Sequence, residues 1–334
     1  MSRPLLWIWC LLLALPPAAV GQARASVLSA DDRLRLSEAR RLADEVGERV
    51  WPGWSKTSFP ILLVTDTVEF LIGHPRPDES FARLGYDSLL ASDIWSRPRR
   101  FPRTLLATFP AVGGLATVVI GSAERTNKAA TAWVLTLLHE HFHQWQYGQP
   151  NYYANVAQLD LSGGDSTGQW MLDYPFPYDS KPVQESLAAL GVAVGKALDA
   201  PPGRERGRMQ AVVRARERLE RSLTPADYRY LEFQLWQEGV ARYIEYAAAR
   251  AAAEKGAAAA LRGLKDFQPY GHVATGMLEQ QRQDLARLDL ARDRRVAFYP
   301  LGAAIARLLD RTRPSWKATY ASHPFALARL LRAD

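Results

Sequence analysis

The feature that most constrains the fold of this 334-residue chain is a histidine cluster within an apolar segment, LTLLHEHFHQWQYG, at residues 135–148. Three of the chain's six histidines lie there, and Glu140 separates the first two. The spacing of the apolar residues predicts a helix. On a helix, His139 and His143 are one turn apart and project from the same face. Any fold of this chain must therefore supply a chemical partner for two imidazoles on an otherwise apolar helix.

These residues form an H-E-x-x-H motif, and such a pair of imidazoles can hold one zinc ion. Glu140 stands beside the first ligand, where its carboxylate could take a proton from a metal-bound water without binding the metal. His141 points elsewhere on the helix and is predicted to support the site from behind or to lie at the surface. The motif is short, and the alternative is a helix whose histidines are merely exposed or capped.

A zinc site needs a third protein ligand, and Glu238 in the segment LWQEGVARYIEY is our prediction. Leu231 and Leu235 precede it by helical spacings, which places Glu238 on their buried stripe. A carboxylate there is costly unless it is paired or bound to a metal. The alternative is an ordinary buried ion pair with Arg242.

Other acids in the chain remain rival ligands: Glu185 first, and Asp165 more remotely. Gly239, which follows the preferred glutamate, costs about 1 kcal/mol relative to alanine inside a helix. It is understandable if two helices approach closely there. A histidine six residues beyond the motif would indicate a different class of zinc protease, but Gln149 occupies that position.

The first 25 residues, MSRPLLWIWCLLLALPPAAVGQARA, have the pattern of a secretory signal peptide. Cleavage after Gly21 or after Ala25 fits, and an uncleaved anchor is the alternative. The apolar run is too short for a membrane span, so none is expected after cleavage. The only cysteine, Cys10, lies in this leader, so a metal must be held by nitrogen and oxygen. We predict a periplasmic or secreted protein.

Composition predicts a packed globular protein, with 48% hydrophobic residues and ten tryptophans. The net charge of +7 is dispersed, and arginine alternates with glutamate in residues 204–222, which is typical of a solvated helix face. Nucleic acid is therefore not an expected partner. We expect one domain over residues 26–334, with a helical insertion around residues 150–223. The sequence does not specify the oligomeric state.

Periodicity predicts an α+β fold, with a small mixed sheet at the N-terminal side followed by a mostly helical remainder. Strands are expected at residues 61–72, 103–109 and 115–122, with the turn PAVGG joining the last two. Helices are expected at residues 29–50 (capped near Ser29 or Asp31), 124–147 (capped near Thr126 or Asn127), 182–198, 205–223 and 225–254 (capped by Thr224), and from residue 297.

The segments LLHEHFHQW and WQEGVARYIEY together resemble the gluzincin zinc metallopeptidases, specifically the peptidase-MA-like group. The resemblance covers a small part of the chain, an H-E-x-x-H helix and a later E-G-x-A-x-Y helix. It implies a zincin-like fold and a Zn²⁺ cofactor held by His139, His143 and Glu238. It implies Glu140 as the general base, and a peptide or protein substrate. The gap between the two motifs is longer than in the compact members of this group.

The resemblance also implies roles for other segments. The strand LATVVIGS before the first motif would be a sheet edge that aligns an extended peptide. Tyr299 would donate a hydrogen bond to the developing oxyanion, with His272 as a second candidate. Some members carry an acid one turn after the glutamate ligand, but Arg242 stands there. Another group must then orient the imidazoles, and Glu245 and Asp310 are the candidates.

The sequence thus predicts an exported zinc metallopeptidase. One alternative is a non-catalytic exported binding or assembly protein on the same scaffold. A second is a zinc hydrolase acting on a non-peptide envelope substrate.

Overall fold

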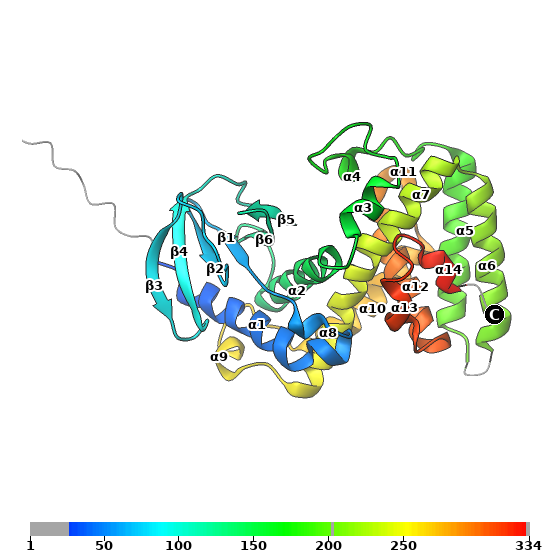
Figure 1. Ribbon diagram of the computed structural model, residues 1–334. Helices are drawn as coiled ribbons and strands as arrows, with labels where there is room; N and C mark the ends of the chain where they lie inside the picture. Colours follow the sequence, from blue (N-terminus) through cyan, green and yellow to red (C-terminus); the bar gives the residue numbers. More distant parts are fainter. Residues whose placement is uncertain (1–26, 202–203, 332–334) are drawn as a thin grey trace, which may run out of the picture.

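A six-stranded mixed sheet on the N-terminal side and a mostly helical remainder make up the computed structural model (Figure 1). This is the predicted α+β arrangement. The structure describes residues 27–201 and 204–331, and the predicted signal peptide lies outside them. The strands are β1 (Ile61–Val64), β2 (Val68–Ile72), β3 (Ala82–Asp87), β4 (Ser92–Pro98), β5 (Leu106–Val112) and β6 (Leu115–Gly121).

The strands lie in the order β3-β4-β2-β1-β6-β5, with β1 and β6 parallel and every other pair antiparallel. The predicted edge position of the segment LATVVIGS is wrong, because β6 lies between β1 and β5. The edge strand beside it is β5. The predicted hairpin between β5 and β6 is confirmed, but its turn is shorter than expected. Only Gly113 and Gly114, both with positive φ, lie between the strands, because residues 110–112 belong to β5.

The single strand expected at residues 61–72 is two strands, β1 and β2. The polar residues Thr65, Asp66 and Thr67 form a turn between them. The Thr65 backbone N–H and hydroxyl both donate to the carbonyl oxygen of Val68, at 2.9 and 2.8 Å. A polar side chain that bonds to nearby backbone competes with the sheet ladder, so the apolar run is interrupted there.

Helices build most of the remaining chain. The longer ones are α1 (Ala30–Val50), α2 (Ala130–Tyr147), α5 (Lys181–Leu198), α6 (Glu205–Arg221), α7 (Pro225–Gln234), α8 (Val240–Lys255), α10 (Tyr270–Ala286) and α12 (Phe298–Thr312). The short ones are η1 (Trp54–Lys56), α3 (Tyr152–Ala157), α4 (Trp170–Asp173), η2 (Leu235–Gly239), α9 (Ala259–Arg262), α11 (Leu290–Asp293), η3 (Arg294–Ala297), α13 (Trp316–Tyr320) and α14 (Leu327–Leu331).

Two predicted helix starts are confirmed. The side chain of Ser29 caps α1, and Thr224 caps α7, with Pro225 as its first residue. The predicted start of α2 is wrong, because Thr126 bonds to nearby carbonyls and Asn127 has a left-handed backbone. The helix begins instead at Ala130 with no side-chain cap.

The two faces of the sheet have separate cores because successive strand residues point in opposite directions. On β1, Ile61 and Leu63 belong to the main core, which includes buried residues of α1, α2 and α8. Leu62 and Val64 belong to a smaller cluster on the opposite face. The main core is therefore continuous from the sheet into the helices.

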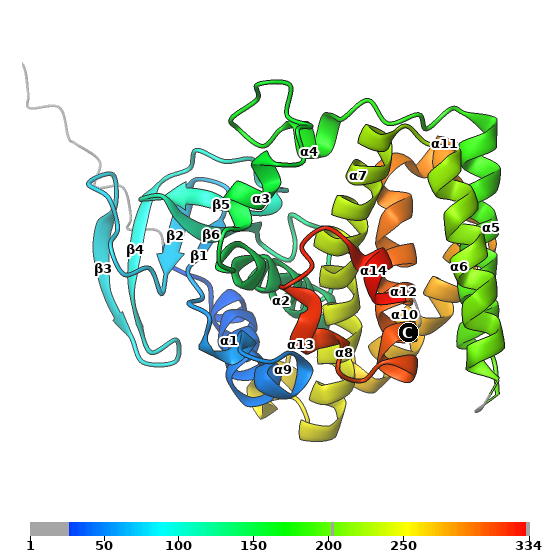
Figure 2. The ribbon, with the colours of Figure 1, turned by 45° about the vertical axis from the view of Figure 1, so that its right-hand side comes forward.

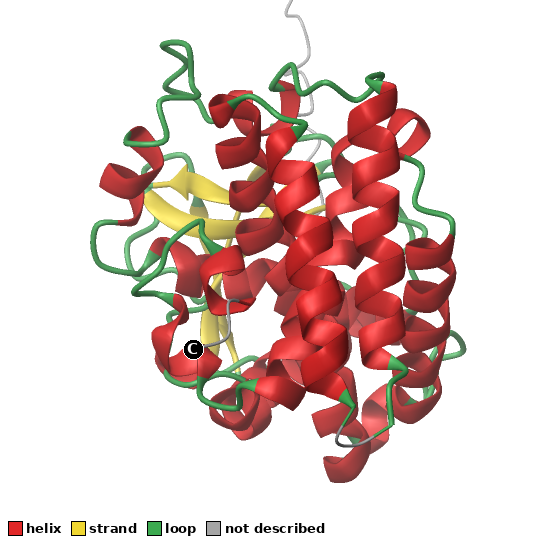
Figure 3. Ribbon diagram, turned by 90° about the vertical axis from the view of Figure 1, so that its right-hand side faces the viewer, coloured by secondary structure: helices red, strands yellow, loops and turns green. Residues whose placement is uncertain are grey.

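Helix α2 lies between the sheet and the helical part, in contact with β5, β6, α1 and α8 (Figure 2). Helices α5 and α6 pair on the side away from the sheet, as Figure 3 shows from that side. Because α2 is packed on both sides, its polar residues are buried. Within the described part of the chain, no helix is both long and apolar enough to cross a membrane.

Candidate metal centre

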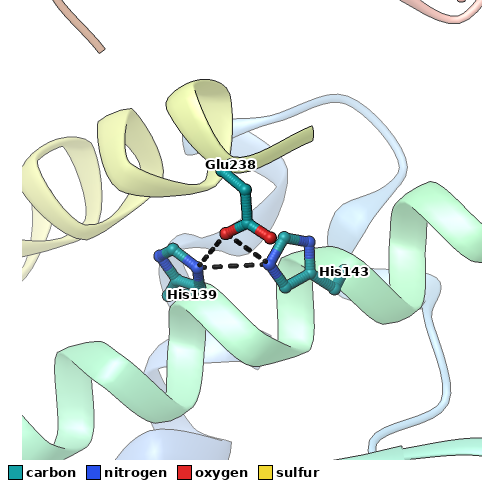
Figure 4. A group of neighbouring side chains, drawn as sticks. All are labelled: His139, His143 and Glu238. Carbon is teal, nitrogen blue, oxygen red and sulfur yellow. Dashed lines mark hydrogen bonds and ion pairs between the residues drawn. The ribbon is translucent and has the colours of Figure 1, made fainter. Parts of the chain in front are cut away.

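Three side chains predicted as metal ligands converge between α2 and the π-helical segment η2 (Figure 4). The Nε2 atoms of His139 and His143 are 3.2 Å apart, and Oε2 of Glu238 is 3.6 Å from each. Both histidines are buried, and the Glu238 side chain is 20% exposed. The cluster could bind a metal ion, and Glu238 is the one ligand of the three that is partly open to solvent.

The backbone that carries Glu238 is a single π turn inside the long helix formed by α7, η2 and α8. Such turns are rare and occur often at functional sites. Gly239 ends this turn, and a Cβ placed on it would lie 2.5 Å from Cα of Gly302 on α12. The expected close approach of two helices is therefore present, between η2 and α12, at the residue after Glu238.

Each imidazole is held from behind through its Nδ1 atom. Nδ1 of His139 is 2.8 Å from Oε1 of Glu245, and that carboxylate is also bonded by Arg242 at 2.5 Å. Glu245 was one of two predicted candidates for this role. The other, Asp310, instead accepts hydrogen bonds from Tyr243 and Trp316.

Nδ1 of His143 is 2.6 Å from Oε1 of Gln146, a contact that the sequence analysis did not identify. The Gln146 amide nitrogen donates to the backbone carbonyls of Trp236 and Gln237. Since these acceptors fix which end of the amide is the nitrogen, its oxygen faces His143 and favours the tautomer with the hydrogen on Nδ1. The Gln237 side-chain amide is 3.0 Å from the same Nδ1.

The donor atoms fit a small divalent cation. With both Nδ1 atoms donating hydrogen bonds, the two Nε2 lone pairs face each other and the Glu238 carboxylate. Two nitrogens bound to one tetrahedral zinc ion at its usual bond length would be about 3.3 Å apart. The observed 3.2 Å is close to that spacing. Three electron-rich atoms so close together require a positive charge between them.

The pKa shifts agree with this requirement. Burial opposes protonation of His139, but the carboxylates of Glu238 and Glu245 outweigh it and raise the pKa of His139 to about 10. Burial would raise the pKa of Glu238, but His143 and His139 hold it well below its usual range. The site therefore stabilises a cation, which can be a proton on an imidazole or a metal ion.

Glu140 is buried beside the cluster and is not one of the three converging ligands. Its Oε2 accepts a hydrogen bond from the Thr108 hydroxyl at 2.8 Å, and the same hydroxyl lies 2.9 Å from the Glu140 carbonyl oxygen. Because Thr108 belongs to β5, the edge strand fixes the position of this carboxylate.

Tyr299, in the first turn of α12, lies close to the same cluster. Its hydroxyl accepts a hydrogen bond from Nη1 of Arg295 at 2.5 Å. Burial raises the pKa of Tyr299, and the nearby Glu238 carboxylate raises it further, so the phenol is protonated at neutral pH. His272, the second predicted donor, is exposed on α10.

The remaining predicted alternatives lie away from the metal centre. Glu185 is exposed on α5, and the half-buried Asp165 accepts hydrogen bonds from Thr167 and the backbone of Trp170. His141 is buried, stacked on Phe59 at 3.7 Å, so the surface position allowed for it is wrong.

A pocket of about 490 Å³ lies at the C-terminal end of α2, and none of the three converging ligands lines it. Tyr147, which stacks on the His143 ring, lines it together with Tyr153, Lys56 and the β5–β6 turn.

Comparisons with protein-family models, with curated proteins and with solved structures found no significant match. The chemistry of the site therefore rests on its own geometry.

Proposed function

We propose that this protein is an exported, zinc-dependent metallopeptidase with a gluzincin-like site and a zincin-like fold. The observation that carries the proposal is the convergence of His139, His143 and Glu238 beside Glu140, a buried acid outside the ligand set. A site that only held a metal would have no need of that acid. A hydrolase requires such a group as a base.

Zinc is the metal that best fits the donor set. Two imidazole nitrogens and one carboxylate, with a fourth position left open, are a common ligand set of catalytic zinc. The chain has no cysteine outside its first ten residues, which disfavours metals that select thiolates. When bound, zinc polarises a carbonyl group and makes a water molecule more acidic.

Side chains of the protein would perform the other steps of hydrolysis. Glu140 accepts a proton from the attacking water at its carboxylate and delivers it to the leaving nitrogen. The protonated Tyr299 hydroxyl donates a hydrogen bond to the oxygen of the carbonyl under attack. Glu245 and Gln146 keep both imidazoles in the tautomer that presents Nε2 to the metal.

Strand β5 is suited to align the substrate. It is the sheet edge nearest α2 and carries Thr108, which bonds to Glu140. An extended peptide can pair with the free backbone groups of an edge strand, which would bring its carbonyl groups past the base. This role replaces the one predicted for β6.

Metal analysis of the purified protein tests the proposal. The wild type should hold one zinc ion per chain, Glu238→Ala should lose it, and Glu185→Ala, the exposed control, should keep it. Glu140→Gln should keep zinc and lose turnover of a mixed peptide library. A Glu238→Ala protein with full zinc, or a Glu140→Gln protein with unchanged turnover, would overturn the assignment.

A further inference from the structure

Arg295 is a half-buried cation that faces the metal centre without a carboxylate partner of its own. It lies on η3, directly before α12, and donates from Nη1 to the hydroxyl of Tyr299. Its guanidinium also lies over the Tyr299 ring, at 5.7 Å from the centroid. Among the described residues, no acid lies within ion-pair distance of it.

The neighbouring arginines are satisfied differently. Arg294 pairs with Asp179 at 2.9 Å, and Arg292 pairs with Asp293 at 2.7 Å. Both are exposed and neither bonds to Tyr299. Of this run of basic residues, Arg295 is therefore the one that is directed inward, where a charge needs a partner.

The position of Arg295 relative to the metal centre follows from Tyr299. The Tyr299 hydroxyl accepts a hydrogen bond from Arg295, and it is close enough to Glu238 for that carboxylate to raise its pKa, while Arg295 lowers it. Burial lowers the pKa of Arg295, but Tyr299 and the Glu238 carboxylate outweigh this effect and raise it. A guanidinium has five N–H groups, and Tyr299 uses one, so most of the fork remains available.

The charges of the loaded site favour an anion there. Glu140, Glu238 and Glu245 carry three negative charges, which a divalent ion and Arg242 offset. Arg295 then adds a positive charge that nothing in the described chain neutralises. A planar guanidinium next to a phenol hydroxyl matches the two oxygens of a carboxylate.

We propose that Arg295 binds a carboxylate of the substrate beside Tyr299, so that the peptides bound here carry a carboxylate close to the bond that is cleaved. This rests on the proposed peptidase function. The carboxylate can be the peptide's C-terminus or an Asp or Glu side chain. Because Arg295 touches the hydroxyl that would contact the scissile carbonyl, the carboxylate belongs within one or two residues of that carbonyl.

Binding measurements test this without relying on turnover. Zinc-loaded Glu140→Gln protein is titrated with acetyl-Ala-Phe-Ala and its C-terminal amide, and with acetyl-Ala-Phe-Asp amide and its Asn counterpart. We expect at least one carboxylate peptide to bind about tenfold or more tightly than its neutral partner. A preference within the first pair assigns the carboxylate to the peptide's C-terminus, and a preference within the second pair assigns it to an acidic side chain.

Variants then assign the effect to Arg295. Adding Arg295→Gln should remove the preference for the carboxylate, so that the charged and the neutral peptide of each pair bind with equal affinity. Arg294→Gln is the control. Arg294 directly precedes Arg295 but pairs with Asp179, so this variant should preserve the preference. Arg295→Lys keeps the positive charge but loses the paired N–H donors of the guanidinium, so it should retain part of the carboxylate preference. This variant replaces Arg295→Gln in the test if the glutamine variant does not fold.

Equal affinity for charged and neutral peptides, or no binding of either, would overturn the inference. So would a preference that survives Arg295→Gln. Wild-type turnover separates the two proposals. Carboxylate-selective binding without hydrolysis would contradict the peptidase function alone, and hydrolysis indifferent to the carboxylate would contradict the Arg295 assignment alone.

Discussion

The side-chain oxygen of Gln146 lies 2.6 Å from Nδ1 of His143, three residues earlier on the same helix. The amide nitrogen of Gln146 donates to the backbone carbonyls of Trp236 and Gln237, the two residues before Glu238 in η2. One neutral side chain therefore orients one metal ligand and fixes the backbone beside another. Its removal should loosen both.

We predict that Gln146→Leu weakens zinc binding by about 10- to 100-fold, which is the usual effect of losing a group that orients a ligand. The measurement is a competition titration against a chelating dye. Gln149→Leu is the matched control, because the Gln149 side chain bonds only to the carbonyl of Trp145 in this structure. Equal zinc affinity in both variants would show that Gln146 does not orient the site.

Thr108→Val should lower turnover and leave the metal in place. The substitution removes the hydroxyl that bonds to Oε2 of Glu140 but touches none of the three ligands. A hydrogen bond to a charged group contributes about 1.5–3 kcal/mol, so a fall in kcat of roughly tenfold or more is expected. Thr108→Ser keeps the hydroxyl and should retain activity. If both variants turn over at the wild-type rate, Thr108 does not position the base.

Gly239→Ala should destabilise the fold. A Cβ there would lie 2.5 Å from Cα of Gly302, and backbone cannot yield as a flexible side chain does. A loss of about 1–3 kcal/mol in the free energy of unfolding is expected from such overpacking. Gly276→Ala on α10 is the control, since its Cβ meets nothing within 4 Å. There the variant should gain about 0.5–1 kcal/mol. Equal denaturant midpoints for the two variants would contradict the close helix crossing.

Much of the metal centre could be predicted because it depends on short-range rules. Helical spacing joins His139 to His143, and the buried stripe of Leu231 and Leu235 marks Glu238 as an acid that needs a partner. Gln146 gave no such signal. It is a neutral amide, and its importance comes from carbonyls about 90 residues away, which only the folded chain brings near.

The sheet shows the same limit. Strand β3 (Ala82–Asp87) leaves most of its side chains exposed, so it lacks the alternation by which strands are recognised, and neither it nor β4 was predicted. The strand order also depends on distant pairing. Strand β1 pairs with β6 in parallel, although β2, β3, β4 and β5 lie between them in the sequence. This pairing leaves β5 at the edge of the sheet.

The stability of the metal-free protein should depend on pH through His141. Burial lowers the pKa of His141 to about 3, although its bond to Gln144 opposes the shift. An unfolded histidine titrates near 6.5. Between these values the unfolded chain binds a proton that the folded chain does not, so His141 stabilises the fold above pH 6.5 and this contribution is lost as pH falls.

His139 acts in a separate window. Its pKa of about 10 exceeds the unfolded value, so its contribution is complete below pH 6.5 and is lost as pH rises towards 10. We propose His141→Phe as the test variant, because it keeps a ring against Phe59. Between pH 5 and 6.5, the difference in unfolding free energy between this variant and the wild type depends on His141 alone. In a chelator, denaturant titrations should show the free energy of unfolding of the wild type falling more steeply with acid than that of the variant. The difference in slope should approach about 1.4 kcal/mol per pH unit. Parallel slopes would mean that the folded protein protonates His141 as readily as the unfolded chain does, which would contradict the lowered pKa.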